Sequence, residues 1–194
     1  MMSKQLFWMC LFLLVAVTPT QALEVGGKIF PDTLDSGTEM LMINGGGIRK
    51  KMIIKVYSAG LYLKKKSDNA SSIVLADVPM AIRLHIISGM VTPEKMEKST
   101  RKGFDKSRHA LAGLLTTSID KEIDQFVSLF KDGIDKDDVY DLIYTPDVGV
   151  KAYKNRQLKS TVKGLDFKRA LFGIWLSDEP VQSDLKKRML GNNS

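Results

Sequence analysis

The sequence lacks the residue patterns of a metal site, a disulfide framework or a common catalytic motif. Its single Cys is Cys10, which excludes a disulfide within the chain and a Cys-based metal site. The two His residues, His85 and His109, show no metal-ligand spacing. The chain also contains neither a phosphate-binding loop nor a nucleophile elbow. We therefore expect no metal and no cofactor.

Long apolar runs are also scarce, and the one that occurs lies at the amino terminus. Leu6–Val17 is an unbroken run of 12 apolar residues that follows a single base, Lys4. Residues 20–22 (Thr-Gln-Ala) then place small side chains at the two positions that a signal peptidase reads. A transmembrane helix needs about 20 apolar residues. We predict that residues 1–22 are a cleaved signal peptide and that residues 23–194 are exported; the alternative is a retained membrane anchor.

Acidic residues are in the minority. The net charge is +7, and it falls to +6 when Lys4 is removed with the predicted signal peptide. The basic residues are scattered over separate segments at 64–66, 95–108 and 186–188, without the interleaved aromatic side chains of a single-strand-binding surface. We therefore expect no nucleic-acid partner. Such a charge is compatible with weak contact with an anionic membrane surface.

The apolar patterning predicts one α+β domain. Strand patterns occur at Met40–Ile43, Met52–Leu63 and Ile82–Ile86, and again at 139–144, 148–153 and 158–162. Helical patterns begin at Thr92-Pro93 and continue with breaks to about 131, and they recur near 167–175 and 183–190. This order predicts a large antiparallel sheet with helices packed on one face.

A glycine-rich segment precedes the best candidate for a binding site. Asn44–Gly47 predicts a tight turn or a close backbone approach. Arg49 follows it directly, and Tyr57 lies in the next predicted strand. An Arg guanidinium matches a carboxylate, and a Tyr hydroxyl adds one donor. At the mouth of an apolar cavity this pair would suit a long-chain acid; the alternative is that both residues are merely structural.

Several segments resemble the chalcone isomerase-like family over nearly all of residues 24–191. The motif Asn44–Arg49, followed by Ile54–Leu63, resembles the core motif of that family. Val25-Gly26 with Phe30-Pro31 resembles its opening strand, and Phe167–Pro180 resembles the closing segment of its bacterial exported branch. The resemblance implies an open-faced β-sandwich with a cleft between sheet and helices. Together with the predicted signal peptide it implies a periplasmic location, with secretion further out left open.

The resemblance also implies roles for individual residues. Arg49 matches the family Arg, and Tyr57 matches the Tyr of the fatty-acid-binding branch, where the true isomerases carry Thr. The isomerases use a Tyr and an Asn where this chain has Thr92 and Ser99. We therefore expect a binding protein rather than an enzyme.

A distance argument separates Arg49 from Tyr57. Eight residues of straight strand would part their Cα atoms by roughly 26 Å, too far to share one carboxylate. They meet only if the chain turns within residues 50–53, where no Gly or Pro marks a turn. Arg49 is therefore the stronger candidate. Ile54, Val56, Phe104 and Leu111 are candidates for lining an apolar tail; the alternative is that they belong to the packed core.

Three functions remain open from the sequence. The first is an exported, non-catalytic binding protein for a fatty acid or similar amphipathic carboxylate, held in the cleft between sheet and helices. The second is a structural or partner-binding envelope protein whose cleft is closed. The third is an isomerase or lyase that acts on a flavonoid-like substrate.

Overall fold

The computed structural model describes residues 22–192. The predicted signal peptide lies, apart from its last residue, outside this range. The strands are β1 (Leu23–Val25), β2 (Lys28–Phe30), β3 (Thr33–Asp35), β4 (Met40–Lys51), β5 (Ile54–Leu63), β6 (Met80–Ile86), β7 (Val139–Thr145), β8 (Gly149–Lys154) and β9 (Gln157–Val162). The helices are α1 (Ala70–Leu75), α2 (Pro93–Ala110), α3 (Asp120–Val127), the 3-10 turn η1 (Ser128–Phe130), α4 (Leu165–Leu176) and α5 (Ser183–Met189).

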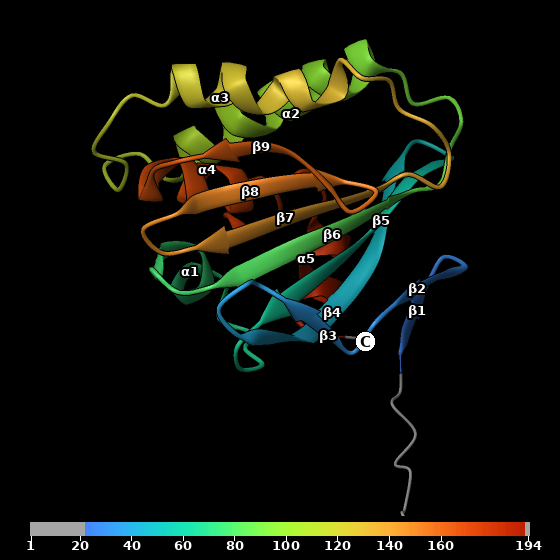
Figure 1. Cartoon of the computed structure of the whole chain (residues 1–194), viewed down its shortest axis with the longest axis horizontal. Helices are drawn as coiled ribbons and strands as arrows, with labels where there is room; N and C mark the ends of the chain where they lie inside the picture. The colour runs from blue at the N-terminus through green and yellow to red at the C-terminus, as the bar shows by residue number, and fades with distance from the viewer. Residues whose placement is uncertain (1–21, 193–194) are drawn as a thin grey trace, which may run out of the picture.

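A seven-stranded antiparallel sheet organises the molecule. Its spatial order is the chain order, β3 to β9, so consecutive strands within this sheet are paired (Figure 1). The hairpin β1–β2 forms a separate two-stranded sheet that contacts β4. The structure thus confirms the predicted α+β fold with a large antiparallel sheet. Within residues 22–192 no helix has the length and apolar character to cross a membrane.

The helices create the main core by covering one face of the sheet. Helix α4 is buried along nearly its whole length and packs against α2, while α3 and η1 extend the same layer. The helices approach closely at Gly173, where an added Cβ would lie 2.1 Å from the Ser107 hydroxyl. A smaller core lies on the opposite face and includes Phe30, Leu41 and Tyr62.

The Asn44–Gly47 segment is not a turn, as the structure shows. Strand β4 runs through it, so the predicted strand Met40–Ile43 continues to Lys51. The glycines instead allow helix α5 to lie against the strand, because a Cβ on Gly45 would meet the Arg188 carbonyl at 2.2 Å. Asn44 forms a bulge, and its amide nitrogen donates to the Met189 carbonyl at 2.9 Å. Of the two readings of this motif, close backbone approach is the correct one.

The chain turns at Met52-Ile53, inside the predicted strand Met52–Leu63. Lys51 pairs with Ile54 across this two-residue turn, so β4 and β5 form a hairpin. Met52 adopts a φ of 55°, a backbone conformation that Gly accepts at lower cost. Because an apolar β-branched run normally indicates a continuous strand, no turn could be identified from composition here.

Most remaining elements agree with the sequence, but helix α1 and the separate short strands β1, β2 and β3 were not predicted individually. Thr92 caps α2 as predicted, since its hydroxyl accepts from the Lys95 backbone N–H at 3.4 Å. The predicted helical block after it divides into α2, α3 and η1. Helix α1 was not predicted, because six residues are too few to show helical periodicity. It begins at the cap residue Asn69 and packs against α4.

Candidate ligand cavity between the sheet and helix α2

The β4–β5 hairpin places the two predicted site residues opposite each other. Arg49 and Tyr57 are direct partners in the antiparallel register. Directly opposed side chains point to the same face of a sheet, with Cβ atoms about 5 Å apart. Val56 is the extra residue of a β-bulge next to this pair, and the bulge changes the direction of the side chains around it. The turn that the sequence did not indicate is therefore what brings Arg49 and Tyr57 together.

A cavity of about 240 Å³ opens beside this pair and is called the outer cavity below. Its walls come from the hairpin, from the connection between β6 and α2, and from the first turns of α2. The lining residues are Arg49, Lys51, Met52, Ile54, Val56, Tyr57, Ser88, Met90, Val91, Lys95, Met96 and Ser99. Three of these are basic and none is acidic. The outer cavity therefore combines apolar walls with a positive electrostatic environment.

Arg49 is half-buried and held from one side only. Its Nη1 donates to the Gln182 Oε1 at 3.1 Å and to the Lys50 carbonyl. Gln182 also joins the strand to the start of α5, because its Nε2 donates to the Ile48 carbonyl at 3.1 Å and its Oε1 accepts from the Lys50 N–H at 2.8 Å. Among the described residues, Arg49 Nε and Nη2 have no hydrogen-bond partner. These donors are available to an anion.

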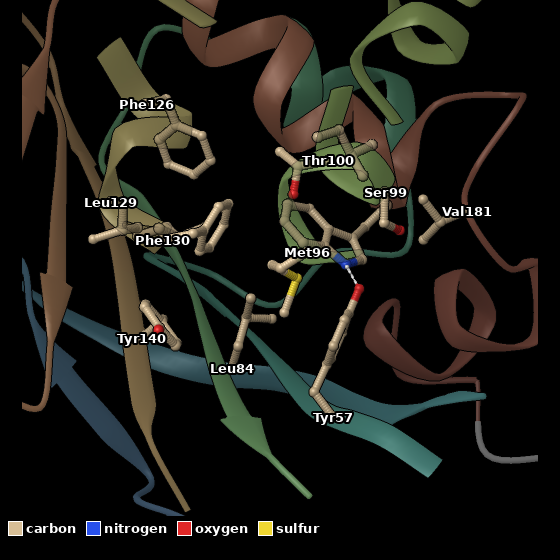
Figure 2. A pocket seen from close by; sticks show the side chains of 13 residues that line it. Tyr57, Leu84, Met96, Ser99, Thr100, Phe126, Leu129, Phe130, Tyr140 and Val181 are labelled. Carbon is tan, nitrogen blue, oxygen red and sulfur yellow. Dashed lines mark hydrogen bonds between the residues drawn. The ribbon is translucent and has the colours of Figure 1, made fainter. Parts of the chain in front are cut away.

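Tyr57 is buried and has one hydrogen bond within the described chain. Its hydroxyl oxygen accepts from the indole Nε1–H of Trp175, on α4, at 3.0 Å (Figure 2). Burial raises the pKa of Tyr57, and the Trp175 hydrogen bond and the positive Arg49 oppose this shift only in part. The hydroxyl therefore stays protonated at neutral pH. The bond to Trp175 uses the Tyr57 hydroxyl oxygen only as an acceptor. The O–H of Tyr57 can therefore still donate a hydrogen bond to a ligand.

A second, smaller cavity of about 40 Å³ lies deeper and is called the inner cavity. Aromatic and aliphatic side chains from the strands and helices surround it, including Phe126, Phe130 and Tyr140 (Figure 2). Tyr57, Met96 and Ser99 line both cavities, so they form the partition between them. The Tyr140 hydroxyl is buried and has no hydrogen-bond partner in the described part of the chain.

The residues predicted to line an apolar tail divide into two pairs. Ile54 and Val56 line the outer cavity as expected. Phe104 and Leu111 line neither cavity and belong to the packed core instead. Phe104 is fully buried and packs against the Phe167 ring at 5.7 Å between centroids. Helical periodicity identifies a buried face but does not distinguish a filled core from a cavity wall. The sequence left both alternatives open, and the structure assigns Phe104 and Leu111 to the core.

Other residues of the site were not identified from the sequence. Gln182 positions Arg49, Trp175 binds the Tyr57 hydroxyl, and Lys95 adds positive charge on the α2 side. Gln182 and Trp175 lie more than 100 residues from their partners, and a single sequence carries no signal of such contacts. In residues 22–192 no group of three or more His, Cys, Asp or Glu side chains is arranged to hold a metal ion.

Comparison with known proteins places the chain in a family. The family model described as chalcone isomerase-like matches residues 22–191. The chain belongs to the chalcone isomerase-like family. A solved structure that it resembles is a fatty-acid binding protein from Arabidopsis thaliana, with a TM-score of 0.67, 20% sequence identity and coverage of 86% of this chain and 93% of that one. A search of curated proteins gave no match.

The chalcone isomerase-like fold gives a structural context to Thr92 and Ser99, the positions where a Tyr and an Asn were expected of an isomerase. Thr92 lines neither cavity and acts as the helix cap described above. Ser99 lies on α2 and lines both cavities. Only one of the two positions therefore faces the space between sheet and helices.

Proposed function

We propose that this chalcone isomerase-like protein is an exported, non-catalytic carrier of a fatty acid or a similar amphipathic carboxylate. The observation that supports it most strongly is the outer cavity, where apolar walls accompany three basic side chains and no acidic one. An anionic head attached to an apolar chain matches both properties. The family membership and the Arabidopsis fatty-acid binding protein support the same class of ligand.

In this proposal the carboxylate lies between Arg49 and Tyr57. The free Nε and Nη2 donors of Arg49 form a fork that fits the two carboxylate oxygens. The Tyr57 hydroxyl, which Trp175 leaves free to donate, adds a third hydrogen bond. Because both side chains stand on one sheet face, they can reach the same head group.

The sizes of the cavities limit the apolar chain. An engineered cavity of about 150 Å³ accepts benzene, and pockets for drug-sized ligands start at about 300 Å³. At about 240 Å³ the outer cavity falls between these values. A longer chain would need the inner cavity as well, which requires Met96 to move from the partition. Methionine suits this because its unbranched side chain adapts to different shapes.

Extraction and a matched affinity series test this function. Protein purified from its natural host should carry a fatty acid detectable by native mass spectrometry after extraction. Arg49→Ala should weaken binding of a fatty acid by about tenfold to a hundredfold, the value of a charged hydrogen bond. The corresponding fatty alcohol should bind both proteins alike. Lys65→Ala, which removes an exposed cation outside both cavities, is the control.

Each alternative function predicts a different result. If Arg49→Ala weakened binding of the fatty acid and the fatty alcohol equally, Arg49 would not be the residue that binds the carboxylate. A protein that carries no fatty acid and takes up none would favour a structural or partner-binding role. Turnover of a chalcone that Arg49→Ala abolishes would favour the isomerase.

The proposed export has its own test. If residues 1–22 are a signal peptide, the protein recovered from the periplasmic fraction should begin at Leu23. Amino-terminal sequencing determines this directly. Recovery of the intact chain with the membrane fraction would instead show that the apolar run Leu6–Val17 is a retained anchor.

A further inference from the structure

The hairpin tip, defined as residues 50–55 (Lys-Lys-Met-Ile-Ile-Lys), is the most exposed apolar segment of the described chain. All six residues are exposed. The side chains of Met52 and Ile53 are 92% and 95% exposed, higher values than for any other large apolar residue in this range. Lysines flank these two residues on both strands. The turn itself is therefore apolar, and the strand ends next to it are positively charged.

The requirements of folding do not explain this composition. Met52 occupies a turn position with φ 55°, where Gly would fit with less strain. Lys50 lies directly opposite Lys55, and like charges in this arrangement destabilise a hairpin. None of the ion pairs in residues 22–192 includes a lysine of the tip. An external partner would relieve both the exposure and the repulsion.

The tip borders the entrance of the outer cavity. Lys51, Met52 and Ile54 belong to both the tip and the cavity lining. The opposite side of the entrance repeats the pattern with Met90, which is 57% exposed, and Lys95, whose Nζ donates to the Met90 carbonyl at 3.1 Å. Apolar and basic side chains thus surround the opening.

We propose that the hairpin tip docks the protein on an anionic lipid bilayer. Met52 and Ile53 enter the interfacial region, and Lys50, Lys51 and Lys55 contact anionic headgroups. This is the arrangement of apolar and basic side chains that binds membrane surfaces.

The charge and shape of the tip favour a bilayer over other occupants. A second copy of the chain would bring like-charged tips together. A stable protein interface needs well over 1,000 Å² of complementary surface, whereas a protruding six-residue turn offers a small convex one. A bilayer admits a protruding apolar turn without shape complementarity, and its anionic headgroups complement the lysines.

Docking also affects how a ligand would reach the outer cavity. This consequence rests on the proposed carrier function, whereas the docking itself does not. With the tip in the interface, the entrance between Met52 and Met90 faces the lipid. An amphipathic acid could then pass between the bilayer and the outer cavity without crossing bulk water.

Co-sedimentation with lipid vesicles tests the docking. The protein used spans residues 23–194, because the packed domain lies within this range and the apolar run Leu6–Val17 would itself bind lipid. Vesicles of phosphatidylglycerol and phosphatidylcholine should bind it, and vesicles of phosphatidylcholine alone should bind it far more weakly. Raising the salt from 0.1 to 1 M should weaken binding, since the Debye length falls from about 10 to about 3 Å.

Matched variants locate the binding surface. Lys50→Gln/Lys55→Gln should lower vesicle binding by about tenfold or more, since each lysine near an anionic surface contributes severalfold. Its folding stability should not fall, because it removes a repulsive pair. Lys65→Gln/Lys66→Gln removes the same charge just beyond the far end of β5, about 30 Å away, and should bind almost as wild type. Ile53→Ser, at a side chain outside the cavity lining, should lower binding by about tenfold.

A site-specific probe provides the second measurement. Residues 23–194 contain no Cys, so a polarity-sensitive fluorophore can be placed on Ile53→Cys and, as a control, on Leu158→Cys of β9. Only the fluorophore on Ile53→Cys should shift its emission to the blue on anionic vesicles.

Equal vesicle binding by the two double-lysine variants, or no binding by wild type, would overturn the proposal. A concentration-dependent dimer without lipid that Ile53→Ser abolishes would assign the tip to a second copy. Vesicle binding without fatty-acid binding would refute the carrier alone.

Discussion

Two cations under the helical layer, Arg49 and Lys168, show opposite uses of a buried positive charge. Arg49 is half-buried beside the outer cavity, and its Nε and Nη2 have no hydrogen-bond partner within residues 22–192. Lys168, on α4, is 0% exposed, and its Nζ donates to the carbonyls of Ile73, Val74 and Ala76 at 3.0, 2.8 and 2.6 Å. The first cation keeps two donors that no described residue uses, whereas the second uses its donors to cap helix α1.

The difference teaches which charged residues can serve binding. Burial lowers the pKa of Lys168 to about 7, with the neighbouring Arg169 contributing and Asp77 opposing. The buried charge of Lys168 is costly, and it is compensated by the three carbonyls, by Asp77 and by the rings of Tyr144 and Phe172, whose centroids lie 5.5 and 5.9 Å from Nζ. Arg49 lies beside a cavity with no acidic lining residue, so an anionic ligand is what would complete its coordination. Four experiments address this contrast.

The largest effect is expected for Lys168→Met. Met fills a similar volume but leaves the three carbonyls at the end of α1 without a donor. The free energy of unfolding should fall by about 3 kcal/mol. Urea unfolding at pH 7, followed by Trp175 fluorescence, measures it. Arg49→Met should cost less than about 1 kcal/mol, and similar losses for both would contradict the assigned roles.

A pH series sharpens the contrast further. The folded pKa of Lys168 is about 7, against an ordinary value of 10.5, so between these pH values the unfolded chain binds one proton more than the folded one. The unfolding free energy should therefore rise with pH in this window, by at most about 1.4 kcal/mol per unit. Below about pH 7 both states are protonated and this contribution is constant. Lys168→Met should remove this dependence of the unfolding free energy on pH. An identical slope in both proteins would mean that a group other than Lys168 causes it.

Tyr57→Phe tests a residue that shares features of both cations, because its hydroxyl contacts the fold and is also proposed to bind the ligand. The change removes the acceptor of the buried Trp175 N–H and also the donor proposed for the ligand. We expect stability to fall by about 1–2 kcal/mol and fatty-acid affinity to fall severalfold. Thermal unfolding with and without ligand separates the effects. Tyr140→Phe is the matched control, because none of the described residues hydrogen-bonds to the Tyr140 hydroxyl and its loss should not reduce stability.

The smallest effect is expected for Arg49→Lys. The substitution keeps the positive charge but loses the planar fork and the free Nε donor. Fatty-acid affinity should fall about fivefold, less than for Arg49→Ala, with stability unchanged. Titration calorimetry with one acid resolves the series. Wild-type affinity in Arg49→Lys would mean that charge alone holds the ligand, without the geometry of the guanidinium.

The sequence located most elements of the fold but not the contacts that make the site. Alternation in Ile82–Ile86 and the Thr92 cap are local features, and both occur where predicted. The turn at Met52 has no such local signal. Neither Gly nor Pro marks it, although Met52 adopts a positive φ. Its position follows from pairing of β4 with β5 along their whole length.

The sequence by itself determined the α+β class, the candidate residues Arg49 and Tyr57, and the excess of positive charge. These depend on composition, periodicity and motif, which are properties of neighbouring residues. Only the tertiary structure decided that Arg49 faces Tyr57, that Trp175 and Gln182 hold them, and that Phe104 fills the core. It also decided the opposite uses of Arg49 and Lys168. Burial and hydrogen bonding are set by segments distant in the chain, so identical charges acquire different roles only when the chain is folded.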